Sequence, residues 1–173
     1  LITQSYSNGN INGEQYEIGG LIGDNYASGN SQSNIKKSYA VGNVTGGQDE
    51  VGGLVGYNYA GSDSEAEIIK SYSLGDVESE SDEVGGIVGD NNGSLNRTYS
   101  IGSVKGTDNI GGLVGLNNCN ITKSYRIGDI NVINSGSIGG LIGTNENNGK
   151  INDSYWNTDN ISISTGNNNG QIN

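Results

Sequence analysis

The chain has 173 residues, a formal net charge of −11 and an apolar content of only 31%. Binding to nucleic acid or anionic lipid depends on Lys and Arg that meet phosphates, so this acidity argues against both kinds of partner. The sequence contains no His and a single cysteine, Cys119, which excludes Ser–His and Cys–His nucleophile pairs and an internal disulfide. No apolar run approaches the length of a membrane span.

Two short words alternate along the chain as a tandem repeat. The first is Ser/Thr-Tyr, and after 13 to 15 residues it is followed by Gly-Gly-Leu/Ile-Val/Ile-Gly. The first word begins at Ser5, Ser38, Ser71, Thr98, Ser124 and Ser154, and the second at Gly19, Gly52, Gly85, Gly111 and Gly139. Self-similarity at a period of about 25 to 35 residues is typical of a solenoid. The repeat therefore predicts a structural or binding role.

Each unit is predicted to hold three short strands, because its apolar runs are short and are bounded by Gly, Asn, Asp and Ser. In the second unit these strands are Ser38–Val41, a strand centred on Val44, and Val51–Val55. We expect an all-β fold, a parallel β-helix or solenoid of about six coils that start near residues 5, 38, 71, 98, 124 and 154. Residues 1–173 are expected to form one solenoid domain, a fragment of a larger protein.

The first two units are longer than the others. From the Gly-Gly word to the next Ser-Tyr they have 19 residues, whereas the later units have 13 to 15. We predict that the additional residues form loops at 26–34 and 59–67, on a side of the solenoid that often carries function. Tyrosines there could stack on sugar rings or pack over the coil edge. The candidate ligand or partner contacts are Tyr26, Tyr57, Tyr59, Asp63, Glu65 and Glu67.

Stacked coils turn equivalent positions into columns, and several columns are predicted to face inward. They are the Tyr of each Ser-Tyr pair, the apolar residue two positions later, and a Val/Ile column. Because the column between Tyr and its apolar partner contains Arg126, we place that intervening column outside. The tyrosines are Tyr6, Tyr39, Tyr72, Tyr99, Tyr125 and Tyr155, the apolar partners are Val41, Leu74, Ile101 and Ile127, and the third column is Ile11, Val44, Val77, Val104 and Ile130.

An Asn column follows the Gly-Gly words. Asn amides can satisfy one another along a stack, and Asn tolerates the left-handed conformation of a corner. We therefore predict a buried or half-buried corner ladder, with a ligand site as the alternative. Its members are Asn25, Asn58, Asn91, Asn117 and Asn145.

The Gly-Gly word leaves two alternatives open, because Val51, Leu54 and Val55 cannot all face one side of a regular strand. In the first, the Gly pair forms a bulge that turns both Leu54 and Val55 inward. In the second, one column is exposed as an apolar stripe for contact with another domain or chain. That column is Leu21, Leu54, Ile87, Leu113 and Leu141.

Charged residues also gather in groups. A basic column precedes the Ser-Tyr pairs, and acids cluster elsewhere. We interpret the acids as a solvated surface with some ion pairing, and we expect no cofactor; Ca²⁺ held between turns is the alternative, since hard cations favour clustered carboxylates. The basic column is Lys37, Lys70, Arg97 and Lys123, and the acids are Asp49, Glu50, Asp63, Glu65, Glu67, Glu78, Glu80, Asp82 and Glu83.

The unit Gly-Gly-Leu-Val-Gly-x-Asn…Ser-Tyr-Ser-x-Gly-x-Val resembles the GLUG motif, a repeat of large extracellular bacterial and archaeal proteins. The closing Ser154-Tyr155-Trp156-Asn157-Thr158-Asp159 resembles the end of such arrays, with Asn157 where Asp is usual. The resemblance covers nearly the whole chain. It implies a secreted or cell-surface location and a β-helical stalk or adhesin-like module, and it supplies no catalytic residues.

We therefore expect a non-enzymatic extracellular module that spaces, displays or attaches. A subunit of a self-assembling filament or surface array is the first alternative, and a glycan- or Ca²⁺-binding module is the second. The expected partners are flanking domains of the same polypeptide or neighbouring subunits, with a host-surface protein or glycan as a further possibility. A carboxylate pair for glycan cleavage remains conceivable, but such a pair should interrupt the repeat, and the acids here lie in Ser- and Gly-rich segments.

Overall fold

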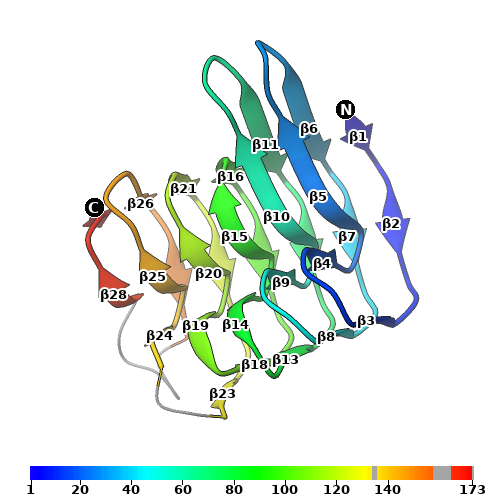
Figure 1. Ribbon diagram of the computed structural model, residues 1–173, viewed down its shortest axis with the longest axis vertical. Coiled ribbons are helices and arrows are strands. Elements are labelled where there is room, and N and C mark those ends of the chain that lie inside the picture. The colour runs from blue at the N-terminus through cyan, green and yellow to red at the C-terminus, as the bar shows by residue number, and fades with distance from the viewer. Residues whose placement is uncertain (134–135, 158–164, 173) are drawn as a thin grey trace.

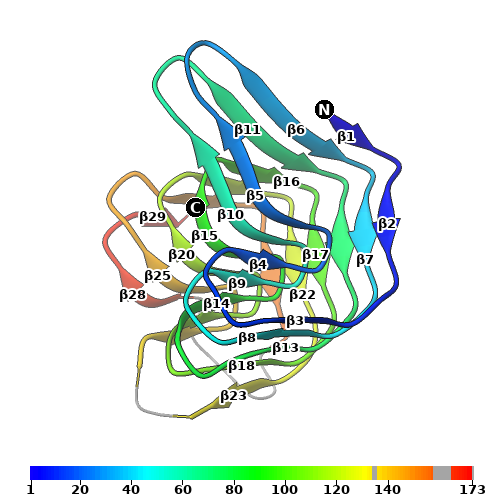
Figure 2. The same ribbon diagram turned by 45° about the vertical axis from the view of Figure 1, so that its right-hand side comes forward.

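The chain folds into an all-β parallel β-solenoid of about five turns, with part of a sixth (Figures 1 and 2). The computed structural model describes residues 1–133, 136–157 and 165–172. Each complete turn contributes one strand to each of five sheets, and every strand pairs in parallel with its equivalents in the adjacent turns. The predicted fold class is therefore confirmed.

The sheets are numbered here in chain order. Sheet 1 consists of β2 (Tyr6–Ser7), β7 (Tyr39–Ala40), β12 (Tyr72–Ser73), β17 (Tyr99–Ser100), β22 (Tyr125–Arg126) and β27 (Tyr155–Trp156). Sheet 2 consists of β3 (Ile11–Gly13), β8 (Val44–Gly46), β13 (Val77–Ser79), β18 (Val104–Gly106) and β23 (Ile130–Val132). Sheet 3 consists of β4 (Ile18–Gly19), β9 (Val51–Gly52), β14 (Asp82–Gly85), β19 (Asp108–Gly111) and β24 (Ile138–Gly139).

The two remaining sheets carry the longer strands. Sheet 4 consists of β5 (Ile22–Ala27), β10 (Val55–Ala60), β15 (Val88–Asn92), β20 (Val114–Asn117), β25 (Ile142–Asn145) and β28 (Thr165–Asn168). Sheet 5 consists of β1 (Ile2–Thr3), β6 (Gln32–Lys36), β11 (Glu65–Ile69), β16 (Ser94–Asn96), β21 (Asn120–Thr122), β26 (Lys150–Asn152) and β29 (Gln171–Ile172).

The prediction of three strands per unit was wrong, because the Gly pair divides the Val51–Val55 segment between β9 and β10, and sheet 5 adds a further strand before each Ser-Tyr pair. The segments 26–34 and 59–67, which were predicted to be loops, hold the ends of strands around short turns. β5–β6 and β10–β11 extend beyond the other turns as a two-layered flap (Figure 1). The two insertions have equal length, so Ala27 pairs with Ala60 and Gln32 pairs with Glu65 in register. Parallel pairing thus satisfies backbone groups that a lone insertion would leave open. Only the short turns at 28–31 and 61–64 remain between the strands.

The corners of the coil use left-handed backbone at two repeated positions. Lys37, Lys70, Arg97 and Lys123 have φ between 50° and 56° just before sheet 1, and Glu17, Glu50 and Glu83 have φ between 57° and 63° just before the sheet 3 pairs. The Asn column takes no part in these left-handed corners, because Asn58 and its equivalents lie in the strands of sheet 4.

The Gly-Gly word forms the bulge, and the exposed apolar stripe is ruled out. The N–H groups of Leu54 and Val55 both donate to the Ile87 carbonyl of the next turn, at 3.0 Å each. Both side chains therefore enter the main core, where Leu54 and Ile87 are fully buried. Val51, before the Gly pair, packs instead in a second core beneath sheets 2 and 3. The Val/Ile column of sheet 2 lines that second core, as predicted.

The predicted orientation of sheet 1 was wrong by one residue. The tyrosines and their apolar partners face outward, with Tyr6 61% and Ile127 49% exposed, whereas the intervening column is buried. The reason lies across the core, where a Cβ on Gly86 would overlap the Ser100 hydroxyl. The second glycines of the Gly-Gly words form a column opposite sheet 1, and only a side chain that lies flat against this glycine column can face inward. The column is Gly20, Gly53, Gly86, Gly112 and Gly140. The intervening column consists of Ala40, Ser73, Ser100, Arg126 and, half-buried, Trp156.

Arg126 misled the sequence prediction because an arginine ordinarily marks a solvent face. Here its side chain is 2% exposed and lies against Gly112. One guanidinium Nη donates to the Asp129 carbonyl at 2.6 Å. Burial lowers the pKa of Arg126 to about 10, although the nearby charge of Asp129 acts to raise it.

Candidate functional site

The Asn column is a buried ladder, as predicted, but its predicted position at a left-handed corner was wrong, because Asn58 and its equivalents lie in the strands of sheet 4. Each Nδ2 donates to the Oδ1 of the equivalent Asn one turn further along, at 2.7 to 2.9 Å, from Asn25 as far as Asn168. Asn58, Asn91 and Asn117 have no exposed surface. Since these amides satisfy one another inside the rod, the alternative of a ligand site at this column is not needed to explain them.

The flap places its tyrosines on the outer surface. Tyr26 and Tyr59 stack with ring centroids 4.9 Å apart, and Tyr57 lies 5.6 Å from Tyr59 at a tilt of 34°. Tyr26 and Tyr59 therefore cover one face of each other, which reduces the surface that could stack on a sugar ring. Local packing, the alternative to a sugar platform, accounts for this contact.

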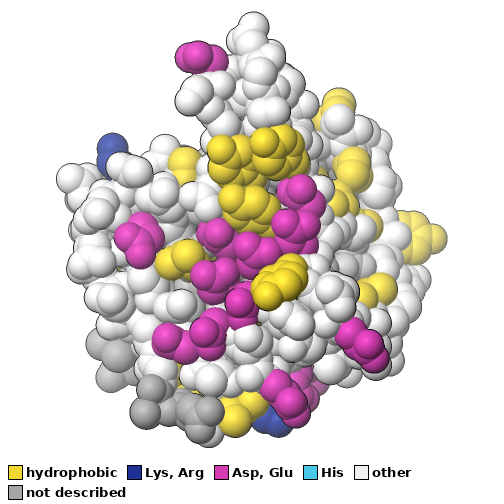
Figure 3. All heavy atoms as spheres, viewed as in Figure 1, with side chains coloured by type: hydrophobic (Ala, Val, Ile, Leu, Met, Phe, Trp, Pro, Cys, Tyr) yellow, Lys and Arg dark blue, Asp and Glu magenta, His cyan; other side chains and the backbone are white. Residues whose placement is uncertain are grey.

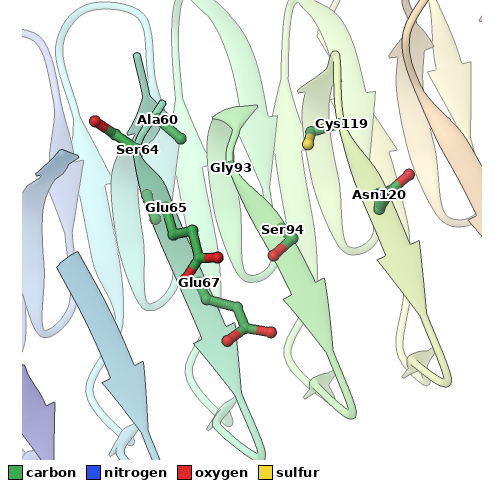
Figure 4. A pocket seen from close by; sticks show the side chains of 9 residues that line it. Ala60, Ser64, Glu65, Glu67, Gly93, Ser94, Cys119 and Asn120 are labelled. Atoms are coloured by element: carbon green, nitrogen blue, oxygen red, sulfur yellow. The ribbon is translucent and has the colours of Figure 1, made fainter. Parts of the chain in front are cut away.

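The acids predicted for the flap do not form a single cluster, because Asp63 lies in the turn whereas Glu65 and Glu67 lie in β11. Asp63 is exposed at the turn, and Glu65 accepts a hydrogen bond from Gln32 at 3.0 Å. Glu65 and Glu67 line a shallow pocket of about 260 Å³ where the flap overhangs the shorter third turn (Figure 4). The half-buried thiol of Cys119 lies at the far side of this pocket.

A second acidic group does converge, on the face below the flap (Figure 3). Carboxylate oxygens of Glu50, Glu83 and Asp90 all lie within 4.8 Å of one another. Glu50 and Glu83 occupy successive left-handed corners, and Asp90 comes from β15. Asp90 is 8% exposed and accepts two hydrogen bonds from Asn92 at 3.0 and 3.1 Å. We call these three residues the acidic triad.

Sequence reasoning found Glu50 and Glu83 but missed Asp90. The three acids meet only because two columns run side by side, one at the corner before sheet 3 and one in sheet 4. The second column holds Asp24, Tyr57 and Asp90 in register. Asp24 and Asp90 each follow an Ile-Gly or Val-Gly pair, which identifies them as equivalent positions. The sequence does not reveal that Asp90 lies close to Glu83.

The environment of the acidic triad favours protonated carboxyls. Burial, reinforced by Glu50, raises the pKa of Glu83 to about 7, and burial with Glu83 raises the pKa of Asp90 to about 7. Burial and then Glu17 raise the pKa of Glu50. Tyr57 beside them has its pKa raised to about 12, first by burial and then by Asp90. The triad can thus share protons, or offer oxygen ligands of the kind that a hard cation prefers.

The next turns replace these charges with neutral groups. Asn109 stands in the corner column after Glu83, and Thr144 stands in the sheet 4 column two turns after Asp90. The Thr144 hydroxyl donates to Asn109 Oδ1 at 2.6 Å. Neutral side chains at equivalent positions can therefore form a hydrogen bond to each other, so the fold does not require acids at these positions.

Comparison with known proteins identifies one family. Residues 47–78 match the family described as the GLUG motif. This chain contains a GLUG motif and folds as a β-solenoid. The matched segment of the GLUG chain runs from the end of β8 through β9–β12 into β13, which is one turn of the solenoid with its Gly-Gly word and Ser-Tyr pair.

The other comparisons are negative. No curated protein and no solved structure matches the GLUG chain. No helix in the described part of the chain is long and apolar enough to cross a membrane. In the array-ending sequence, Thr158 and Asp159 lie outside the described residues, while Tyr155 and Trp156 continue sheet 1 as β27.

Proposed function

We propose that this chain is a non-enzymatic structural module of an extracellular protein, a rod that spaces, displays or attaches its neighbours. One observation carries the proposal: the same backbone and side-chain ladders continue through every complete turn. Five parallel sheets and the Asn ladder run along the rod without a break in register. In such a stack each turn is held by its neighbours, so the distance and orientation between the two ends of the rod are fixed.

Attachment is assigned to the flap, which projects beyond the other turns (Figure 1). It presents the stacked pair Tyr26 and Tyr59, and at its tip the exposed Asp63. Contacts made there leave the ladders untouched. We propose flanking domains or neighbouring subunits as the partners of the rod and a host-surface protein or glycan as the partner of the flap.

Surface labelling and electron microscopy test this role. Antibodies raised against the chain should label intact cells of the source as strongly as permeabilised cells, and protease added to intact cells should remove the label. Labelling that needs permeabilisation contradicts the extracellular location. Negative-stain images of the native material should show separate short rods. Continuous filaments or a regular lattice would replace this role with that of a self-assembling subunit.

A further inference from the structure

Sheet 1 presents an apolar face that no other element of the described part of the chain covers. Half of the fourteen large apolar side chains exposed in the described residues lie on it, in two adjacent columns: Tyr6, Val41, Leu74, Ile101, Tyr125, Ile127 and Tyr155. The tyrosine rings from Tyr6 to Tyr125 stack with centroids 4.7 to 5.4 Å apart and tilts of at most 11°. Sheet 1 forms one side of the rod (Figure 2).

The stacking of the tyrosine rings indicates which kind of partner can bind to sheet 1. Sugar rings bind to the flat faces of aromatic rings, but in this stack each inner ring is covered on both faces by its neighbours. What remains outside is a row of ring edges and hydroxyls beside a row of aliphatic side chains. A row of side chains from another protein molecule can pack against such a surface.

The two edges of this face carry opposite charge in the third and fifth turns, where Lys70 lies across from Asp76 and Lys123 from Asp129; in the other turns Asn10, Asn43 and Ser103 are the neutral equivalents of Asp76. Along one edge stands the exposed basic column, for example Lys70. Along the other edge Asp76 is exposed, and its Oδ1 accepts the Ser103 N–H at 2.8 Å, which holds the carboxylate in place. Within the described residues the basic column makes no ion pair; the pair found there joins Lys105 to Glu78 on sheet 2.

The face is also complementary to itself. In the turn that runs Lys70-Ser71-Tyr72-Ser73-Leu74-Gly75-Asp76, the lysine and the aspartate lie three residues on either side of Ser73, and the tyrosine and the leucine lie one residue on either side. A 180° rotation about an axis parallel to the rod, above the Ser73 column, therefore places Tyr72 on Leu74 and Lys70 on Asp76 of a second copy. Rotation about the perpendicular in-plane axis places lysines on lysines, which repel.

We propose that two copies of this chain pair side by side through sheet 1, with their rods parallel and related by a two-fold axis. Such an interface is isologous and closes at the dimer. Six strands at about 4.8 Å, each about 20 Å wide between its charged edges, give about 500 Å² per copy. That area is at the low end for specific interfaces, so the pair is expected to have a Kd of about 1 µM to 1 mM.

Sedimentation of the 173-residue chain between 1 µM and 1 mM tests the proposal. We expect a monomer–dimer equilibrium that weakens with added salt. Leu74→Asp and Lys70→Glu should each raise the Kd at least tenfold, while the matched controls Tyr16→Asp and Lys150→Glu, at exposed sites away from sheet 1, should leave it unchanged. Far-UV circular dichroism and the Tm of each variant establish that it folds.

A charge swap tests the two-fold geometry itself. The combined change Lys70→Glu and Asp76→Lys should restore most of the affinity lost in Lys70→Glu, because each copy then presents the reversed pair. A strictly monomeric chain at 1 mM overturns the proposal. So does a dimer that is indifferent to Leu74→Asp, a swap that fails to rescue in a folded variant, or growth beyond the dimer with concentration, which indicates end-to-end stacking. Pairing is independent of where the protein is located, so surface labelling can fail while pairing holds, and the reverse.

Discussion

Asn58 Nδ2 donates to Asn91 Oδ1 at 2.8 Å across adjacent turns, and neither side chain has any exposed surface. Asn91 in turn donates to Asn117 at 2.8 Å. Each inner amide therefore belongs to two ladder bonds that water cannot replace. An unpaired polar group at such a position costs more than the hydrogen bond itself contributes.

Removing one rung should therefore destabilise the rod strongly. We expect Asn91→Ala to lower the free energy of unfolding by about 2 to 4 kcal/mol, since it leaves the Asn58 donor and the Asn117 acceptor buried without their partners. Urea unfolding followed by circular dichroism measures the change. Asn131→Ala, at an exposed position in β23, serves as the control and should stay within about 0.5 kcal/mol. Equal stability of the two variants would mean that the ladder contributes nothing.

The close approach of sheet 1 to the Gly-Gly word makes a second prediction. A Cβ on Gly86 would overlap both the Gly112 carbonyl and the Ser100 hydroxyl. Because a close-packed backbone cannot move aside, Gly86→Ala is expected to cost about 3 kcal/mol or more. Gly9→Ala is the matched control, since no atom lies within 4 Å of its added Cβ. A Tm for Gly86→Ala equal to that of the control would contradict the packing described here.

The orientation of the strands in sheet 1 can be tested with a pair of isoleucines. Ile87 is fully buried in the main core, whereas Ile101 on sheet 1 is 43% exposed. We expect Ile87→Ala to cost about 3 kcal/mol and Ile101→Ala to cost less than about 1 kcal/mol. Unfolding should be measured below about 1 µM, the lower limit of the expected Kd, where most of the chain is monomeric. A larger loss for Ile101 than for Ile87 would restore the inward orientation.

The acidic triad predicts how stability depends on pH. Glu83 and Asp90 have folded-state pKa values near 7, above their ordinary values of 4.5 and 3.8. The folded state then holds more protons than the unfolded state between about pH 4 and pH 7, so the free energy of unfolding rises as the pH falls through this window. Above about pH 8 both states are deprotonated, and this contribution no longer varies with pH.

Glu83→Gln should flatten that profile. The substitution removes one of the three repelling carboxylates, so we expect it to raise the Tm at pH 8 and to reduce the gain on acidification. Glu80→Gln, at an exposed position nearby, is the control. All buffers should contain EGTA. A gain in stability of the unmodified chain when CaCl₂ replaces EGTA, absent in Glu83→Gln, would instead show that the triad holds a cation.

The fold was predictable because residues that recur at equivalent positions of each repeat lie above one another when the turns stack. Asn25 and its equivalents recur after each Gly-Gly word, and a buried amide ladder is the arrangement that satisfies such a column. The direction of sheet 1 was not predictable in the same way. Its strands are two residues long, so alternation fits equally well in either phase, and Tyr72 appeared a better core residue than Ser73. The glycine column opposite decided the phase, and that contact exists only in three dimensions.

The acidic triad shows a similar limit. Glu50 and Glu83 are equivalent positions in successive turns, so the sequence brings them together. Asp90 joins them only because the chain turns through the bulge at Gly85–Ile87 and returns beside the corner. The flap was misjudged for a related reason. Ser- and Asn-rich insertions are typical of loops, and only their equal length allowed them to pair as strands.

That equality has a consequence for how such a rod changes over generations. The flap strand ending at Ala27 finds its partner in the flap strand ending at Ala60. A lengthened turn that stands alone leaves an open strand edge, whereas duplication of an already lengthened unit supplies a ready partner of the same length. Equal turn length in neighbouring units thus lets each flap strand pair with the next. Natural variants should gain or lose such flaps in adjacent pairs or longer runs, which makes the number of long turns a record of past duplications.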